Sequence, residues 1–235
     1  MAERAGPLVC GLVATLPISA GPVYFFLALD HDASFLAASA MASLVANAVT
    51  GLFALIYILV AQVRGPVLSL ATALGFWLGT IFLVRSISWG LGGALALNAA
   101  SYLVAIPIAR RFRSAQFRPP ARRWYDPLLR ACLVAALVAT VVGISTRVGP
   151  TLTGMLAVFP IVLTSLILIF HPRIGGPATA AILANTLPGL VGFAVAVLAL
   201  HLSAVPLGKS AALVLALAVS VGWNLTLWAN RHRGW

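Results

Sequence analysis

The side chains that could do chemistry in this chain are few, and they lie near the ends of its apolar stretches. Four residues are acidic, namely Glu3, Asp30, Asp32 and Asp126. A carboxylate in the middle of a membrane costs about 2.5–3.5 kcal/mol on insertion scales and usually marks an ion or proton pathway. Because each of the four lies at the end of an apolar stretch or outside it, the sequence disfavours a pump or symporter coupled through buried carboxylates.

The histidines and the known catalytic motifs add no reactive centre. The four histidines also lie near the ends of apolar stretches and lack the HExxH spacing that places two metal ligands on one helix face. The segment Asp30-His31-Asp32 could bind a cation loosely, or it could be a polar turn between two helices. No GxSxG nucleophile motif, phosphate loop or dinucleotide fingerprint occurs in a suitable context. The sequence therefore names no catalytic residue, metal ligand set or cofactor, and we expect no enzyme.

The remaining candidate site is uncharged. Pro17 and Pro160 interrupt two apolar stretches, and a proline inside a helix removes a backbone hydrogen bond and frees a carbonyl. Asn47 and Asn185 lie in the stretches that follow, with Pro188 close behind Asn185. These five residues predict a polar pocket near the middle of the bilayer. The alternative is that the asparagines only join helices, a contribution of about 0.6 kcal/mol each.

The composition places these residues in a membrane. Hydrophobic residues make up 62% of the 235 residues and charged residues 8%, against about a quarter in soluble domains. A helix crosses the hydrocarbon core with about 20 apolar residues, whereas a barrel strand would alternate polar and apolar residues. We predict an all-α integral membrane protein with eight transmembrane helices, at about 7–29, 35–61, 66–84, 89–109, 127–146, 150–170, 177–203 and 208–229.

The formal charge of +11 sets the expected orientation. The arginines form short clusters between apolar stretches, which is typical of topology-setting charge rather than of nucleic-acid binding. The segment 110–126 is the longest polar break, and by the positive-inside rule it is cytoplasmic, as are both termini. Five of its arginines are candidate contacts for anionic lipid headgroups: Arg110, Arg111, Arg113, Arg122 and Arg123.

An internal repeat divides the chain. The first copy contains Gly6-Pro7, Gly11, Pro17, Asn47, Thr50-Gly51 and Trp77, and the second contains Gly149-Pro150, Gly154, Pro160, Asn185, Pro188-Gly189 and Trp223. Spans one to three correspond to spans six to eight, and this odd offset predicts opposite orientations in the membrane. We therefore expect a first repeat at 1–109, a basic linker at 110–126 and a second repeat at 127–235, related by inverted topology as in many secondary transporters.

The second copy resembles a known family. From Pro127 to Arg231 it has an opening apolar helix, a Gly-x-x-x-x-Phe-Pro segment at Gly154 to Pro160, a short polar turn and two further helices. This pattern is similar to that of the four-span GlpM-like proteins of the bacterial inner membrane. The resemblance implies a helical fold in the bacterial cytoplasmic membrane, and it implies no catalytic or binding residue.

Two functional hypotheses follow. The first is a transporter-like or flippase-like protein for a neutral, amphipathic or lipid-linked solute, with membrane lipids as its surroundings. The second is an accessory or structural protein of envelope or polysaccharide machinery that transports nothing. The first predicts a cavity between the repeats, and the second predicts a solidly packed bundle. A homo-oligomer is compatible with either hypothesis, whereas a nucleic-acid partner is not expected.

Overall fold

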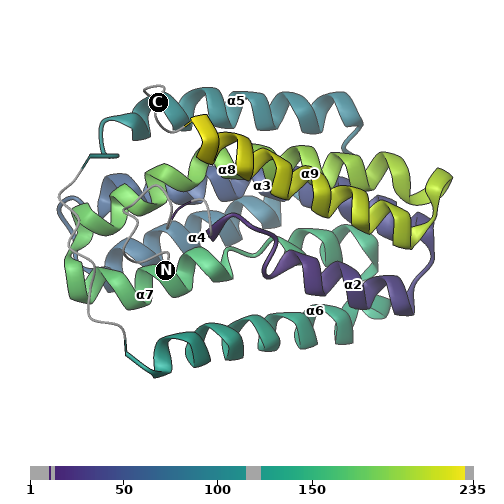
Figure 1. Ribbon diagram of the computed structural model, residues 1–235, viewed down its shortest axis with the longest axis horizontal. Coiled ribbons are helices and arrows are strands. Elements are labelled where there is room, and N and C mark those ends of the chain that lie inside the picture. The colour runs from purple at the N-terminus through teal and green to yellow at the C-terminus, as the bar shows by residue number, and fades with distance from the viewer. Residues whose placement is uncertain (1–10, 12–13, 115–122, 231–235) are drawn as a thin grey trace.

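The computed structural model describes Gly11, residues 14–114 and residues 123–230, and this part of the chain is helical throughout. Eight helices are defined in it: α2 (Ala20–Asp30), α3 (Ala33–Val60), α4 (Pro66–Val84), α5 (Leu91–Arg110), α6 (Tyr125–Ala157), α7 (Ile161–Ile174), α8 (Gly176–Leu207) and α9 (Lys209–Ala229). Figure 1 shows them running along the long axis of the molecule.

Six of these helices are long and apolar enough to cross a membrane: α3, α4, α5, α6, α8 and α9. The helices α2 and α7 are apolar but shorter, with 11 and 14 residues. Only helices and closed barrels satisfy every backbone polar group inside a bilayer, and the described residues contain no strand. The chain is a multi-pass helical membrane protein.

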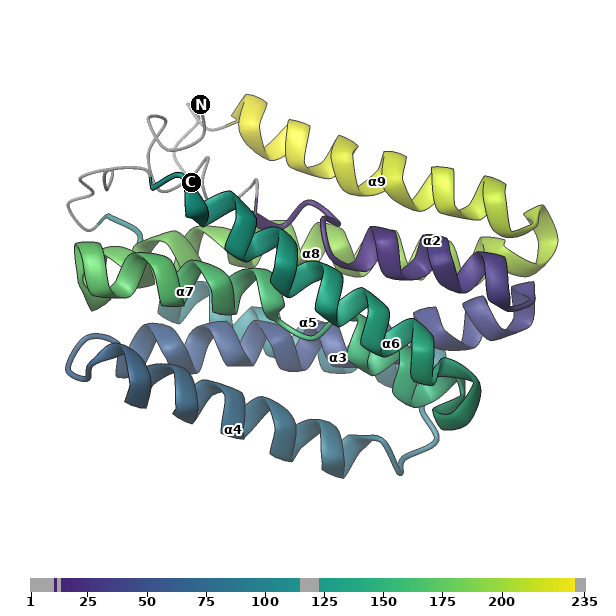
Figure 2. The same ribbon diagram turned by 90° about the horizontal axis from the view of Figure 1, so that it is seen from below.

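The two short helices follow interruptions at the prolines. The chain leaves helical geometry between Thr15 and Ser19, around Pro17, before α2 begins, and again around Pro160 before α7 begins. The predicted spans 7–29 and 150–170 are therefore not continuous helices. Gly149 marks the expected boundary between spans five and six, because its φ of 74° and ψ of 174° break the helical path within α6. The residues after Gly149 run back along α3 toward α7 (Figure 2).

Helices α3 and α8 form the centre of the molecule and run antiparallel to each other. Near their middles the amide of Asn47 donates to the carbonyl of Leu190 at 3.1 Å. Near one end, Nδ1 of His201 lies 2.8 Å from the carbonyl oxygen of Ala37. Both helices are rich in alanine, serine and glycine at buried positions, and small residues let helix backbones approach closely in a membrane.

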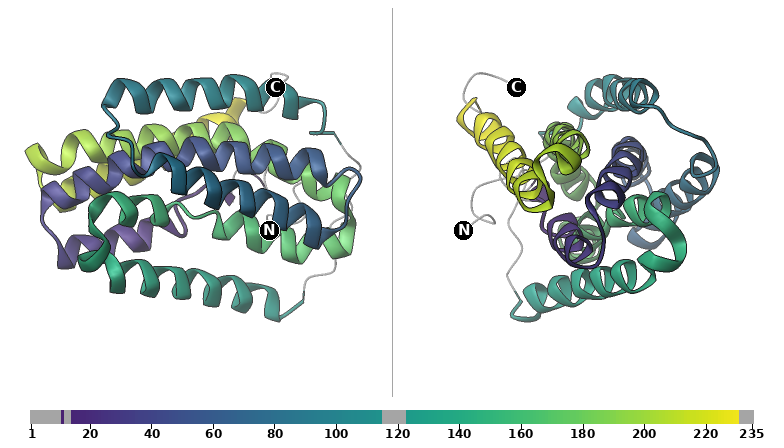
Figure 3. Two further views of the ribbon diagram at one scale, coloured as in Figure 1. Left: turned by 180° about the vertical axis from the view of Figure 1, so that it is seen from behind. Right: turned by 90° about the vertical axis from the view of Figure 1, so that its right-hand side faces the viewer.

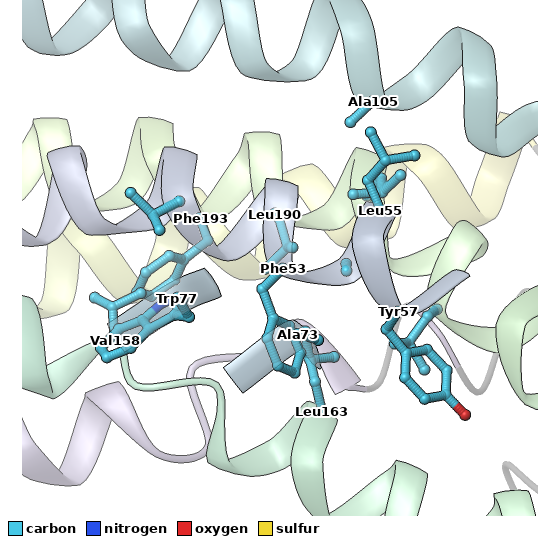
Figure 4. Close-up of a cluster of buried hydrophobic side chains, with 14 of the residues drawn as sticks. Phe53, Leu55, Tyr57, Ala73, Trp77, Ala105, Val158, Leu163, Leu190 and Phe193 are labelled. Atoms are coloured by element: carbon cyan, nitrogen blue, oxygen red, sulfur yellow. The ribbon is translucent and has the colours of Figure 1, made fainter. Parts of the chain in front are cut away.

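The apolar core gathers around this central pair. Large side chains from several helices are fully buried there, including Phe53 and Trp77 (Figure 4). The ring of Trp77 meets that of Phe159 edge to face, with 5.1 Å between their centroids. In contrast, α5 and the first part of α6 lie at opposite margins of the bundle (Figure 3), and few residues of α6 are buried. A large cavity lies at the margin beside α6.

Candidate functional site

The two proline interruptions meet in the interior. Pro17 and Pro160 line one small cavity of about 50 Å³, together with Thr50 of α3 and Leu190 of α8. A water molecule in the liquid occupies about 30 Å³, so this space suits one or two waters at most. The structure therefore brings the two predicted prolines together, but around a cavity too small for a solute.

Asn47 is not among the residues that line this small cavity. It is fully buried, and its amide donates to Oδ1 of Asn98 on α5 and to the carbonyl of Leu190 on α8, each at 3.1 Å. The hydroxyl of Tyr102 on α5 donates to the backbone carbonyl of Asn47 at 3.0 Å. The side chain of Asn47 thus joins α3 to both α5 and α8, while its Oδ1 has no hydrogen-bond partner.

Asn185 has separate partners. Its amide donates to the carbonyl of Ala181 in its own helix at 2.8 Å, and at 3.5 Å to the carbonyl of Arg113. No hydrogen bond joins Asn185 to Asn47. The predicted pair of asparagines therefore serves two different contacts rather than one shared polar centre.

Pro188 and Thr50 occupy matched positions in the proposed repeats and receive matched hydrogen bonds. The indole Nε1 of Trp223 on α9 donates to the carbonyl of Pro188 at 2.9 Å. The indole Nε1 of Trp77 on α4 donates to Oγ1 of Thr50 at 3.0 Å. These bonds hold α9 against α8 and α4 against α3, so that both tryptophans pack and anchor helices.

A groove of about 1060 Å³ lies between α2, α6 and α7. Its walls are apolar along most of its length, with Val138 and Val142 from α6, Phe26 from α2, and Leu166 and Phe170 from α7. Small-molecule sites commonly enclose 300–1,000 Å³ and combine apolar walls with a few polar groups. The groove meets this description, because Asp126 and Arg130 lie among its lining residues.

An ion pair lies at the charged end of the groove. Asp126, at the start of α6, accepts from both terminal nitrogens of Arg173 at the end of α7, at 2.6 and 2.7 Å. The backbone N–H of Arg123 also donates to this carboxylate, at 3.2 Å. Bidentate pairs of this kind combine charge with fixed geometry. Asp126 is nearly inaccessible to solvent, and the pair ties α6 to α7.

Arg130 is a candidate residue that the motifs in the sequence do not single out. It lies one helical turn after Asp126, inside the predicted span 127–146, and its guanidinium carbon is 5.5 Å from the centre of the Phe170 ring. Its Nε is buried without a hydrogen-bond partner. The signal was available, because an ionisable residue inside an apolar span is a functional candidate by default.

The predicted headgroup arginines differ in their surroundings. Arg110, Arg111 and Arg123 are exposed, and the guanidinium of Arg123 donates to the Tyr125 hydroxyl. Burial, reinforced by the charge of Arg110, lowers the pKa of the Arg113 guanidinium. Arg122 lies outside the described residues. Contact of these arginines with lipid headgroups stays a prediction.

The segment Asp30-His31-Asp32 is a helix-capping turn. Asp32 accepts from the backbone N–H of Phe35 at 2.8 Å as the N-cap of α3, and this bond is the main reason that the pKa of Asp32 lies below its ordinary value. Nε2 of His31 lies 2.7 Å from the hydroxyl of Ser145. Within the described ranges, no group of three or more histidine, cysteine or acidic residues could hold a metal ion.

Comparison with family models, with curated proteins and with solved structures gives no match to this chain.

The role of Asn47 can be tested through its partner. We expect Asn47→Ala to lower the free energy of unfolding by about 1 kcal/mol, because bonds between membrane helices contribute about 0.6 and at most about 1.7 kcal/mol. Asn98→Ala in the same protein should then add less than it does alone. Asn185→Ala is the matched control and should cost less, because the shorter of its bonds stays within its own helix. Unfolding titrations in detergent measure all four proteins, and additive losses at 47 and 98 would contradict the contact.

Proposed function

We propose that this protein binds an amphipathic, lipid-like solute in the groove between α2, α6 and α7 and moves it across the bilayer, as a transporter-like or flippase-like protein. The observation that carries the proposal is the groove itself, about 1060 Å³ of apolar space with a charged end. A purely polar solute would find few partners along these walls. A molecule with a polar head and an apolar tail matches both parts.

The proposed route lies at the side of the bundle rather than through its centre. The cavity between the two proline interruptions holds about 50 Å³, far less than the groove. The side chains of Leu128 and Leu129 on α6 are exposed on the bundle surface, next to residues that line the groove. In a bilayer such a surface faces lipid, so an amphipathic molecule could enter sideways with its tail remaining in hydrocarbon.

An inverted repeat is part of the proposal, and matched contacts support it. Trp77 and Trp223 donate to the matched positions Thr50 and Pro188. The interruptions at Pro17 and Pro160 line one cavity, and α3 and α8 run antiparallel at the centre. Transporters with inverted repeats move substrate by shifting one set of helices against the other around interrupted helices. The groove lies beside both interruptions, since Ala14 and Val162 line it as well as the small cavity.

The proposed location is the bacterial inner membrane, as the GlpM-like resemblance of the second repeat implies. The proposed orientation rests on charge. Six arginines lie on the connections and helix ends at one end of the bundle: Arg64, Arg110, Arg111, Arg113, Arg123 and Arg173. The other end holds three cations, Arg85, Arg147 and Lys209, with two aspartates. The positive-inside rule makes the arginine-rich end cytoplasmic.

The accessory role remains the second candidate, because the centre of the bundle is well packed. The cavity that Pro17 and Pro160 both line is about 50 Å³. A structural protein would also have only a small cavity at its centre. Such a protein could hold a lipid in the groove without moving it. Transbilayer movement of the lipid separates the two candidates.

Orientation is tested by labelling single cysteines in a background without the natural ones. Ser114→Cys, after α5, and Ser34→Cys, at the start of α3, are both at exposed positions at opposite ends of the bundle. We expect an impermeant thiol reagent added to intact cells to label position 34 and to label position 114 only after the cells are opened. Labelling of both positions from the same side would contradict the proposed topology.

Transport is tested by filling the groove. We expect the purified protein in vesicles to accelerate transbilayer movement of fluorescent lipids, and Ala139→Trp, which places a large ring on the groove wall, to reduce that rate at least tenfold. Leu83→Trp is the control, because Leu83 is exposed on α4 and does not line the groove. No acceleration by the unmodified protein over empty vesicles would refute transport and favour the accessory role. Equal rates in the two variants would refute the groove as the route.

A further inference from the structure

The charged end of the groove holds one acidic and two basic side chains that are close to one another. Asp126 and Arg130 line the groove, and Arg173 pairs with Asp126 through two hydrogen bonds. One positive charge is thus left over within the group. We assign this extra positive charge to Arg130, because Asp126 already accepts hydrogen bonds from both terminal nitrogens of Arg173 and from the backbone N–H of Arg123.

The surroundings of Arg130 leave its charge only partly compensated. Its Nε is buried without a hydrogen-bond partner, and its guanidinium lies 5.5 Å from the centre of the Phe170 ring, which also lines the groove. A contact with an aromatic face neutralises no charge. Asp126 attracts the guanidinium electrostatically, but this carboxylate is already paired with Arg173. An anion in the groove would complete the compensation.

We propose that the occupant of the groove is a lipid with a phosphate headgroup, and that Arg130 binds the phosphate. The proposal rests on the proposed function and names the class of its substrate. A guanidinium presents a planar fork of donors that matches a phosphate through two parallel hydrogen bonds. In this arrangement Asp126 is a positioning residue, because it holds Arg173 and leaves Arg130 available for the ligand.

The apolar part of the groove fits the tail of such a lipid. Along α6 the lining continues beyond Arg130 as far as Gly143, 13 residues further on, or about 20 Å at the helical rise. The hydrocarbon core of a bilayer is about 30 Å thick, so one leaflet is about 15 Å deep. A tail that begins at Arg130, near the arginine-rich end, would therefore extend past the middle of the membrane, beside the interruption at Pro160.

The test compares two lipids with the same tails. Phosphatidic acid carries a phosphate monoester, and diacylglycerol carries none. Binding of each to the full-length protein in detergent is measured by native mass spectrometry. We expect the unmodified protein to bind phosphatidic acid at least tenfold more tightly, and Arg130→Gln to lose most of this preference. Arg130→Lys keeps the charge without the fork and should retain part of it. Arg85→Gln removes an exposed arginine that does not line the groove and lies at the other end of the bundle, and it should change nothing.

Each outcome has a separate meaning. Equal binding of the two lipids, or an unchanged preference in Arg130→Gln, overturns the phosphate proposal while leaving a lipid-binding groove in place. Binding of neither lipid overturns the proposed function as well. Inorganic phosphate is added as a third ligand, and full displacement of phosphatidic acid by it at equal concentration would show a site for free anions instead. Should Arg130→Gln not fold, the comparison of Arg130→Lys with Arg85→Lys decides, and equal preference there overturns the proposal.

Discussion

The architecture depends on backbone-to-backbone contact between α3 and its neighbours, which only residues without a side chain allow. A Cβ atom added at Gly154 would lie 2.0 Å from the carbonyl oxygen of Ser39, and one added at Gly176 would lie 1.9 Å from that of Ala61. Lipid tails are as apolar as the side chains of helices, so burial supplies little drive for helices to associate in a membrane. Close packing and hydrogen bonds between helices must supply it. The hydroxyl of Ser43 adds such a bond, donating to the carbonyl of Gly154 at 2.6 Å.

These contacts explain why the groove exists where it does. The part of α6 after Gly149 is held tightly against α3, whereas the part before Gly149 belongs to a helix at the margin with few buried residues. The ion pair between Asp126 and Arg173 fixes the far end of this marginal helix to α7. A helix held at its two ends, and loosely packed between them, leaves apolar space along its length. The groove is therefore a consequence of the turn at Gly149 and of the ion pair.

Much of the fold could be predicted from the sequence, because membrane helices are encoded locally. The six long helices follow from continuous apolar stretches, and the interruptions follow from Pro17 and Pro160. The separate partners of Asn47 and Asn185 could not be predicted. Their matched positions in the proposed repeats do not show which face of each helix meets α5, a helix to which the proposed repeats assign no counterpart. The place of Arg130 could not be predicted either, because the sequence does not show that this arginine, just inside an apolar span, lines a groove with its Nε buried and unpaired.

The central claim, that close contact at Gly154 organises the bundle, is tested most directly by the unfolding free energy of Gly154→Ala against Gly143→Ala. Both glycines lie on α6, and a Cβ at Gly143 would have no heavy atom within 4 Å. We predict that Gly154→Ala lowers the unfolding free energy in detergent by about 1–3 kcal/mol through overpacking. Gly143→Ala should leave it unchanged or raise it by up to about 1 kcal/mol, because alanine is the better helix former. Equal stability of the two variants would contradict the account.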